Sequence, residues 1–222
     1  RMAGAESVTV DFSLFSMFSG SPVNAIHEIV VRQPQAVLEQ RKDGSWNYED
    51  LISGSRSENA FRGVVRVENG RLTGRMDGRE LLLENLNGSF DLAEHPSVRL
   101  KADFTNHEAK VALSGSVGGE RQTLSVDGSG FVLEDYLAFL PAGTLPEEIQ
   151  VQSGTIDKLT AVLVKTGDNL SYSGQAEFSH GQVEVMGTAV TDIQGLLTLN
   201  EREISVFANA AAQEQKASVH GR

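Results

Sequence analysis

The sequence predicts an all-β fold with two short helices: an elongated, twisted and curled antiparallel sheet that forms an open apolar groove. First, short segments alternate apolar and polar residues, the period of a strand with one apolar face. Second, turns containing Asn-Gly or Asp-Gly separate these segments, in a chain with 22 Gly and 5 Pro. Third, similar phrases recur about 110 residues apart, which favours an elongated structure over a closed single-core barrel.

Residues 1–59 are interpreted as a first unit of the groove, ending in a polar stretch at 53–59. Apolar residues at helical spacing predict a short helix at 13–18. Pro34 separates two of the strands and implies an edge or a bend, because proline cannot donate a ladder hydrogen bond. Period-2 alternation predicts strands at residues 7–12, 26–31 and 36–40.

The stretch around the only tryptophan links a strand to a polar segment. Asp43-Gly44 predicts a tight turn, since Gly accepts a positive φ and Asp tolerates one. Asn47 is a candidate cap for a short helix beginning at Tyr48. Trp46 is interpreted as a structural anchor that plugs the end of the apolar interior.

Residues 60–222 are interpreted as further groove units, in which strand follows strand. Hairpin turns are predicted at Asn69-Gly70 and at Asp77-Gly78. The strands expected in the first part of this region lie at residues 61–67, 71–76, 80–86, 88–92, 98–104 and 109–117.

The second short helix is predicted at residues 133–140, where three leucines and a tyrosine cluster on one face. Pro141 and Gly143 end it. Strands are expected again from Ile149 to Val219.

An internal repeat relates the two halves of this region. Gly63 matches Gly174, and Gly70 matches Gly181, within phrases that keep their order. The matched segments are 61–72 with 172–183, 86–88 with 193–195, and 110–115 with 216–221.

Residues 29–51, IVVRQPQAVLEQRKDGSWNYEDL, together with the repeated aromatic-x-Gly phrases, resemble the TamB and AsmA-like proteins. The resemblance implies the repeating β-groove, or β-taco, fold. It also implies a periplasmic segment of a protein anchored in the inner membrane. By the same resemblance, the segment carries glycerophospholipids between the inner and outer membranes, without a chemical step. The family is also linked to assembly of outer-membrane proteins with an outer-membrane β-barrel partner.

The expected groove lining consists of inward-facing residues of the alternating strands. Val, Leu and Ala dominate this set and large aromatics are few, which leaves space for something other than side chains, and phospholipid acyl chains are the expected occupants. The expected lining residues are Phe61, Val65, Val67, Leu72, Phe90, Leu92, Val98, Leu100, Ala102, Phe104, Val111, Leu113, Leu124, Val126, Ile156, Ala161, Leu163, Phe178, Val183, Val185, Leu197, Leu199, Ile204, Val206 and Ala208.

Composition and motifs exclude several functions. The net charge of −11 argues against nucleic-acid partners and against electrostatic docking on anionic lipid, so any bound lipid is expected to be held by apolar contact. The absence of Cys removes thiol nucleophiles and Cys-ligated zinc, and the five His are scattered without metal-ligand spacing. No catalytic or phosphate-binding phrase occurs. We therefore expect no enzyme activity, metal or cofactor.

Three alternatives stay open. One is a closed β-sandwich or solenoid with a filled core. Another is a repetitive β adhesin or surface-layer protein that binds through exposed loops. A glycan-processing β-helix enzyme is the third, and it would require carboxylates stacked on successive strands. The sequence contains neither a spanning apolar run nor a signal peptide, so we interpret it as a segment of a longer protein.

Overall fold

The chain consists of two units, each built almost entirely from β-strands. The computed structural model describes residues 3–13, 25–47, 61–76, 78–94, 96–137, 149–200, 203–212 and 215–221. Unit 1 comprises Arg1–His107 with Ala112–Gln122, and unit 2 comprises Glu108–Val111 with Thr123–Arg222. The predicted boundary between residues 59 and 60 falls within unit 1, outside the described residues.

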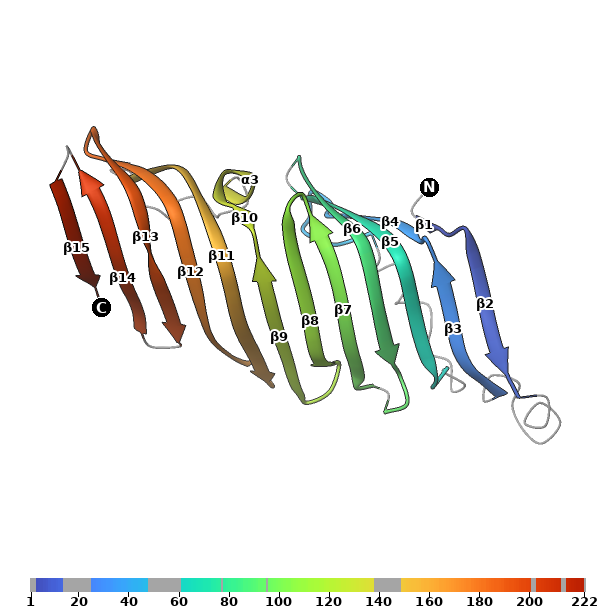
Figure 1. Ribbon diagram of the computed structural model, residues 1–222. Coiled ribbons are helices and arrows are strands. Elements are labelled where there is room, and N and C mark those ends of the chain that lie inside the picture. The colour runs from blue at the N-terminus through green and yellow to red at the C-terminus, as the bar shows by residue number, and fades with distance from the viewer. Residues whose placement is uncertain are drawn as a thin grey trace. The chain divides into compact units, whose positions relative to one another are not determined.

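Unit 1 is a layer of strands in the order β1-β4-β5-β6-β7, with β2 and β3 continuing it beside β5. Figure 1 shows β5, β6 and β7 side by side as neighbouring ribbons. β8, at Ala109–Val117, divides between the two units. The other strands are β1 (Ala3–Gly4), β2 (Ser7–Phe12), β3 (Ile26–Arg32), β4 (Gln35–Glu39), β5 (Val64–Met76), β6 (Arg79–Asp91) and β7 (Val98–Asn106).

Two strand pairs of unit 1 are parallel, so the prediction of a purely antiparallel sheet is wrong. β3 and β4 lie one after the other along β5, and both are parallel to it. Pro34 lies in the break between them, where Gln33 has a φ of 47° and its backbone N–H donates to the Glu68 carbonyl oxygen. A parallel pair needs a long connection, and residues 40–63 provide it between β4 and β5.

Unit 2 is an antiparallel layer in the order β9-β11-β12-β13-β14-β15, with β10 paired to β11. In Figure 1, β11 to β15 run side by side from yellow to red. Among the described residues, neither unit has pairings that close its sheet on itself. The strands are β9 (Arg121–Ser129), β10 (Phe131–Val132), β11 (Ile149–Thr166), β12 (Asn169–Val185), β13 (Thr188–Asn200), β14 (Glu203–Ala212) and β15 (Gln215–Gly221).

One helix is present in the described part of the chain. α3, at Leu133–Leu137, confirms the start of the predicted helix at 133–140, and the remaining predicted turn lies outside the described residues. The predicted helix at 13–18 lies outside them too, apart from Ser13, as does the helix expected from Tyr48.

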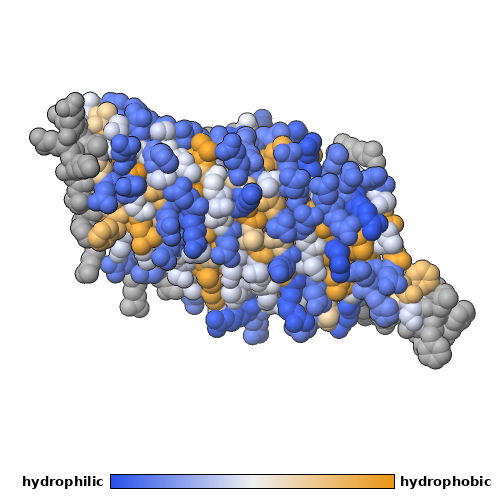
Figure 2. Space-filling model, in the orientation of Figure 1, coloured by the Kyte–Doolittle hydropathy of each residue, from blue (hydrophilic) through white to orange (hydrophobic). Residues whose placement is uncertain are grey.

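The outer face of unit 1 carries charged side chains that pair across neighbouring strands. Arg66 Nη2 lies 2.7 Å from Glu28 Oε1, and Arg32 Nε lies 2.8 Å from Glu68 Oε2. Each such exposed pair contributes about 0–1 kcal/mol to the free energy of unfolding, so these pairs make the face polar but add little stability. Figure 2 shows one side of the molecule, on which hydrophilic side chains outnumber hydrophobic ones.

β-Bulges interrupt the long strands, and one of them corrects a prediction. Asn69-Gly70 is not a hairpin turn, because β5 runs through it as one strand and the hairpin follows at Met76, which pairs with Arg79. Asn69 has a φ of 53°, the left-handed conformation that the same dipeptide adopts in turns. One extra residue is therefore inserted into β5 between Val67 and Gly70, which pair with Gly88 and Leu86.

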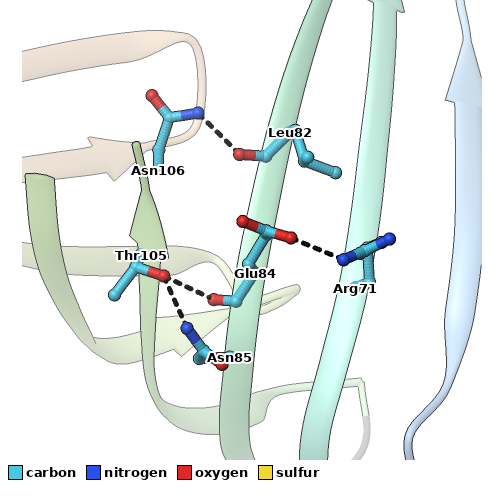
Figure 3. Close-up of polar contacts among 6 residues, drawn as sticks. All are labelled: Arg71, Leu82, Glu84, Asn85, Thr105 and Asn106. Atoms are coloured by element: carbon cyan, nitrogen blue, oxygen red, sulfur yellow. Dashed lines mark hydrogen bonds and ion pairs between the residues drawn. The ribbon is translucent and has the colours of Figure 1, made fainter. Parts of the chain in front are cut away.

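Amide side chains bind the backbone groups around these bulges. Asn87 Oδ1 accepts a hydrogen bond of 2.9 Å from the Asn69 N–H. Figure 3 shows Asn85 Nδ2 donating to Thr105 Oγ1 at 2.9 Å and the buried Asn106 donating to the Leu82 carbonyl oxygen at 2.6 Å. These contacts fix the strand bends that bulges introduce.

Unit 2 contains the same kind of bulge, at a position that the sequence repeat matches. His180, with a φ of 53°, precedes Gly181 as Asn69 precedes Gly70. Gly181 pairs with Ile193 as Gly70 pairs with Leu86. Gly70 and Gly181 are thus matched bulge positions, not matched hairpin turns.

Candidate functional site

An apolar face extends across five strands of unit 1. Directly paired residues point to the same face of a sheet, so the strand register defines rows of side chains. The first row is Val10, Ile29, Val65, Phe90 and Leu100. The second row is Val8, Val31, Val67, Gly88 and Ala102.

The apolar face of unit 1 continues past the bulges. Leu72 pairs with Ala36 on β4 and with Leu83 on β6. Strand alternation places Val98 and Phe104 with Leu100 on β7. Among the other expected lining residues, Leu92 directly follows β6, and Phe61 precedes β5 with its ring beside Gly63.

Unit 2 has an equivalent face. Its register again forms rows of paired residues across four or five strands. The first row is Leu159, Ala176, Leu197, Val206 and Gly221. The second is Ile156, Phe178, Gly195 and Ala208. The third is Ala161, Gly174, Leu199 and Ile204.

The remaining expected lining residues lie on strands of the same kind. Val183 pairs with Val190, and Val185 pairs with Thr188, beyond the bulges of β12 and β13. On β8, Val111 is buried and Leu113 half-buried, two positions apart on one side of the strand. On β9, Leu124 and Val126 are half-buried and likewise two positions apart.

A cavity of about 400 Å³ opens on the apolar face of β11, β12 and β13. The register places Leu159, Ala161, Leu163, Tyr172, Gly174, Ala176, Leu197 and Leu199 on its inner side. Four of these, Ala161, Leu163, Leu197 and Leu199, are expected lining residues. The volume lies within the usual range of small-molecule pockets, roughly 300–1,000 Å³.

Most of these apolar side chains are only partly covered. No large side chain in the described part of the chain is fully buried. The buried hydrophobic residues there are small, namely Ala25, Ala102, Ala109, Val111, Ala176 and Ala208. At the edge strand β2, Val8 is 59% exposed and Val10 41%. Each unit therefore presents an apolar face that its described residues leave partly open to solvent.

Trp46 and the turn before it lie at the end of β4. Gly44 has a φ of 86°, and Asp43 Oδ1 accepts hydrogen bonds from the Ser45 N–H and hydroxyl, which confirms the predicted tight turn. Trp46 forms an isolated bridge with Gln40 and is half-buried. The turn thus holds the tryptophan against the strand end.

The side chain of Asn47 forms hydrogen bonds with the backbone of β4. Its Oδ1 accepts from the Glu39 N–H at 3.1 Å, and its Nδ2 donates to the Val37 carbonyl oxygen at 2.8 Å. The helix for which Asn47 was the expected cap lies outside the described residues.

Four cavity residues, Leu159, Tyr172, Gly174 and Ala176, were missed in the sequence. A register irregularity between Ile156 and Lys158 shifts the alternation of β11, so counting every second residue from Ile156 does not reach Leu159. Ala176 and Tyr172 alternate with Phe178 on β12, and that alternation could have identified them.

Among the described residues, no group of three or more His, Asp or Glu side chains is arranged to hold a metal ion. The same part of the chain contains no helix that is both long and apolar enough to span a membrane. Comparison with known proteins found no matching family model, curated protein or solved structure.

Proposed function

We propose that this chain is a non-enzymatic lipid-conduit segment, which carries phospholipid acyl chains along the apolar faces of its sheets. The proposal includes the TamB/AsmA-like relationship, a periplasmic location and transfer between the inner and outer membranes. An outer-membrane β-barrel partner, contacted through another part of the full-length protein, belongs to the same proposal.

The observation that carries the proposal is the cavity on β11–β13. Its inner side is lined by Leu, Ala, Gly and one Tyr, and all its lining residues belong to β11, β12 and β13. Contiguous exposed apolar surface marks a site that binds something apolar. Sheet faces with ordinary filled cores are instead covered by a second layer.

The energetics suit an acyl chain. Each buried methylene contributes about 0.8 kcal/mol, so a chain of about 16 carbons contributes roughly 13 kcal/mol before entropic losses and incomplete burial. Burial of only half of these methylenes would still keep a lipid tail bound to the protein in water. A ligand held in this way needs neither a metal nor a reactive side chain.

The first experiment is mass spectrometry of an organic extract of protein purified without detergent. We expect near-stoichiometric phospholipid. A clean extract, from protein that also fails to take up a fluorescent phospholipid, would overturn the proposal and favour a structural β-repeat role.

A matched pair of substitutions locates the site. Leu197→Asp places a charge in the cavity, whereas Thr198→Asp places the same charge on the exposed outer face of the same strand. We expect Leu197→Asp to lose lipid while keeping the circular-dichroism spectrum of the wild type, because the open face leaves the carboxylate access to water. Thr198→Asp should retain lipid. In a filled core, Leu197→Asp would instead unfold the unit, since removing a partner or burying a lone charge costs about 3–5 kcal/mol.

A further inference from the structure

In the regular hairpin register of unit 2, one lysine lies on the apolar face. β11 and β12 form a hairpin in which Leu163 pairs with Tyr172 and Lys165 with Leu170. Because side chains alternate along a strand, Lys165 lies on the same face as Leu163 and Ala161, which line the cavity. Lys165 therefore lies beyond the lining residues of the cavity, near the hairpin end.

Lys165 has no partner in the described part of the chain. No ion pair or side-chain hydrogen bond joins it to another described residue, although six such ion-pair contacts hold arginines in unit 1. Its side chain is exposed. The nearest carboxylate in sequence, Asp168, lies in the hairpin turn and forms no ion pair with it.

Tyr172 supplies a second donor on the same face. It lines the cavity and is 41% exposed, and a tyrosine combines an apolar ring with a hydroxyl that donates a hydrogen bond. In the regular register of residues 159–165, 170–178 and 195–199, Lys165 and Tyr172 are the polar side chains on this face. All others there are apolar or Gly.

We propose that the cavity binds an amphiphile with an anionic headgroup, whose chain lies over Leu159–Leu163 and whose headgroup meets Lys165 and Tyr172 at the hairpin end. This inference rests on the proposed function and adds headgroup selectivity and a direction of binding to it. Charge complementarity between Lys165 and an anionic headgroup carries the inference. The net charge of −11 repels an anionic lipid from the chain as a whole, so an anionic headgroup needs a cation beside the cavity.

The test compares two lysophospholipids with the same acyl chain, lysophosphatidylglycerol and lysophosphatidylcholine, below their micelle concentrations. We expect the protein to bind the anionic probe about two- to fivefold more tightly at low salt, the range of an exposed charge pair. High salt should remove the preference. Inorganic phosphate at millimolar concentration should not compete, because the chain supplies most of the affinity.

Two variants make the test specific. Lys165→Gln should lose the preference, or reverse it, because it weakens binding of lysophosphatidylglycerol more than binding of lysophosphatidylcholine. Lys158→Gln is the matched control, since Lys158 is exposed on the same strand and pairs with Glu177, next to Ala176 in sequence and so on the opposite face. It removes the same charge and should retain the preference.

Three results would overturn the inference: equal affinity of the wild type for both probes, equal loss of preference in both variants, or competition by phosphate alone. These outcomes differ from a failure of the proposed function, in which neither lysophospholipid would bind.

Discussion

Ala161 offers the sharpest test of whether the cavity of unit 2 is an open binding site. It lines the cavity and pairs with Gly174, which has no side chain to fill the space beside it. Ala161→Phe would add an apolar ring there without adding charge. Val162→Phe is the matched control, because Val162 borders the same cavity but is 38% exposed, and strand alternation turns its side chain to the other face of the strand.

The expected loss follows from the methylenes that the ring displaces. If it excludes about four methylenes of a bound chain, at about 0.8 kcal/mol each, binding weakens by about 3 kcal/mol, or roughly a hundredfold. The free energy of unfolding should change little, since the ring enters unoccupied space. In a filled core the same ring would overpack the site and reduce stability by about 1–3 kcal/mol.

Titration calorimetry with lysophosphatidylcholine measures the first quantity, and urea unfolding followed by circular dichroism measures the second. We expect Ala161→Phe to lose affinity and keep stability, and Val162→Phe to keep both. Wild-type affinity in Ala161→Phe, or a loss of stability without a loss of affinity, would refute the reasoning.

Two further predictions concern stability. Gly195→Ala would make the new Cβ overlap a carbonyl oxygen of β14, whereas at Gly74 the nearest atom lies at 3.8 Å, so we expect a cost of about 1–3 kcal/mol in urea unfolding at the first site and little change at the second. Equal midpoints would contradict the β13–β14 register. The hydrogen bonds from Ser45 lower the pKa of Asp43 below 3.8, so the stabilisation of this turn is present above that pH and is lost as the pH falls through the lowered pKa. Trp46 fluorescence should report that acid step, and its persistence in Asp43→Asn would exclude Asp43 as the cause.

The strands and their apolar faces were predictable because alternation and turn residues are local signals. Leu100 and Ala102, for example, share the face that their alternation on β7 predicts. The bulge at Asn69 was misread because Asn-Gly favours a positive φ in a hairpin turn and in a bulge alike. Local sequence does not distinguish the two; the pairing of the neighbouring strand does.

Local sequence patterns could not predict which distant segments pair with one another. The parallel alignment of β3 and β4 with β5 depends on how the connection through residues 40–63 returns the chain, and no short motif specifies that path. The cavity residue Leu159 was missed for a related reason, since the irregularity before Lys158 is visible only in the register with β12. Lys165 was not singled out in the sequence, because only the hairpin register places it on the face of the cavity.

The bulges also explain how one apolar face persists along strands that bend. A one-residue insertion moves every later side chain to the other face unless the apolar pattern shifts with it. On β5 the pattern shifts at Asn69, because Val67 and Leu72 are an odd number of residues apart and yet share a face. On β6 the shift falls at Asn85, between Leu83 and Leu86. The sequence therefore encodes the bend and the continuity of the apolar surface together, as a bound chain running past the bend would require.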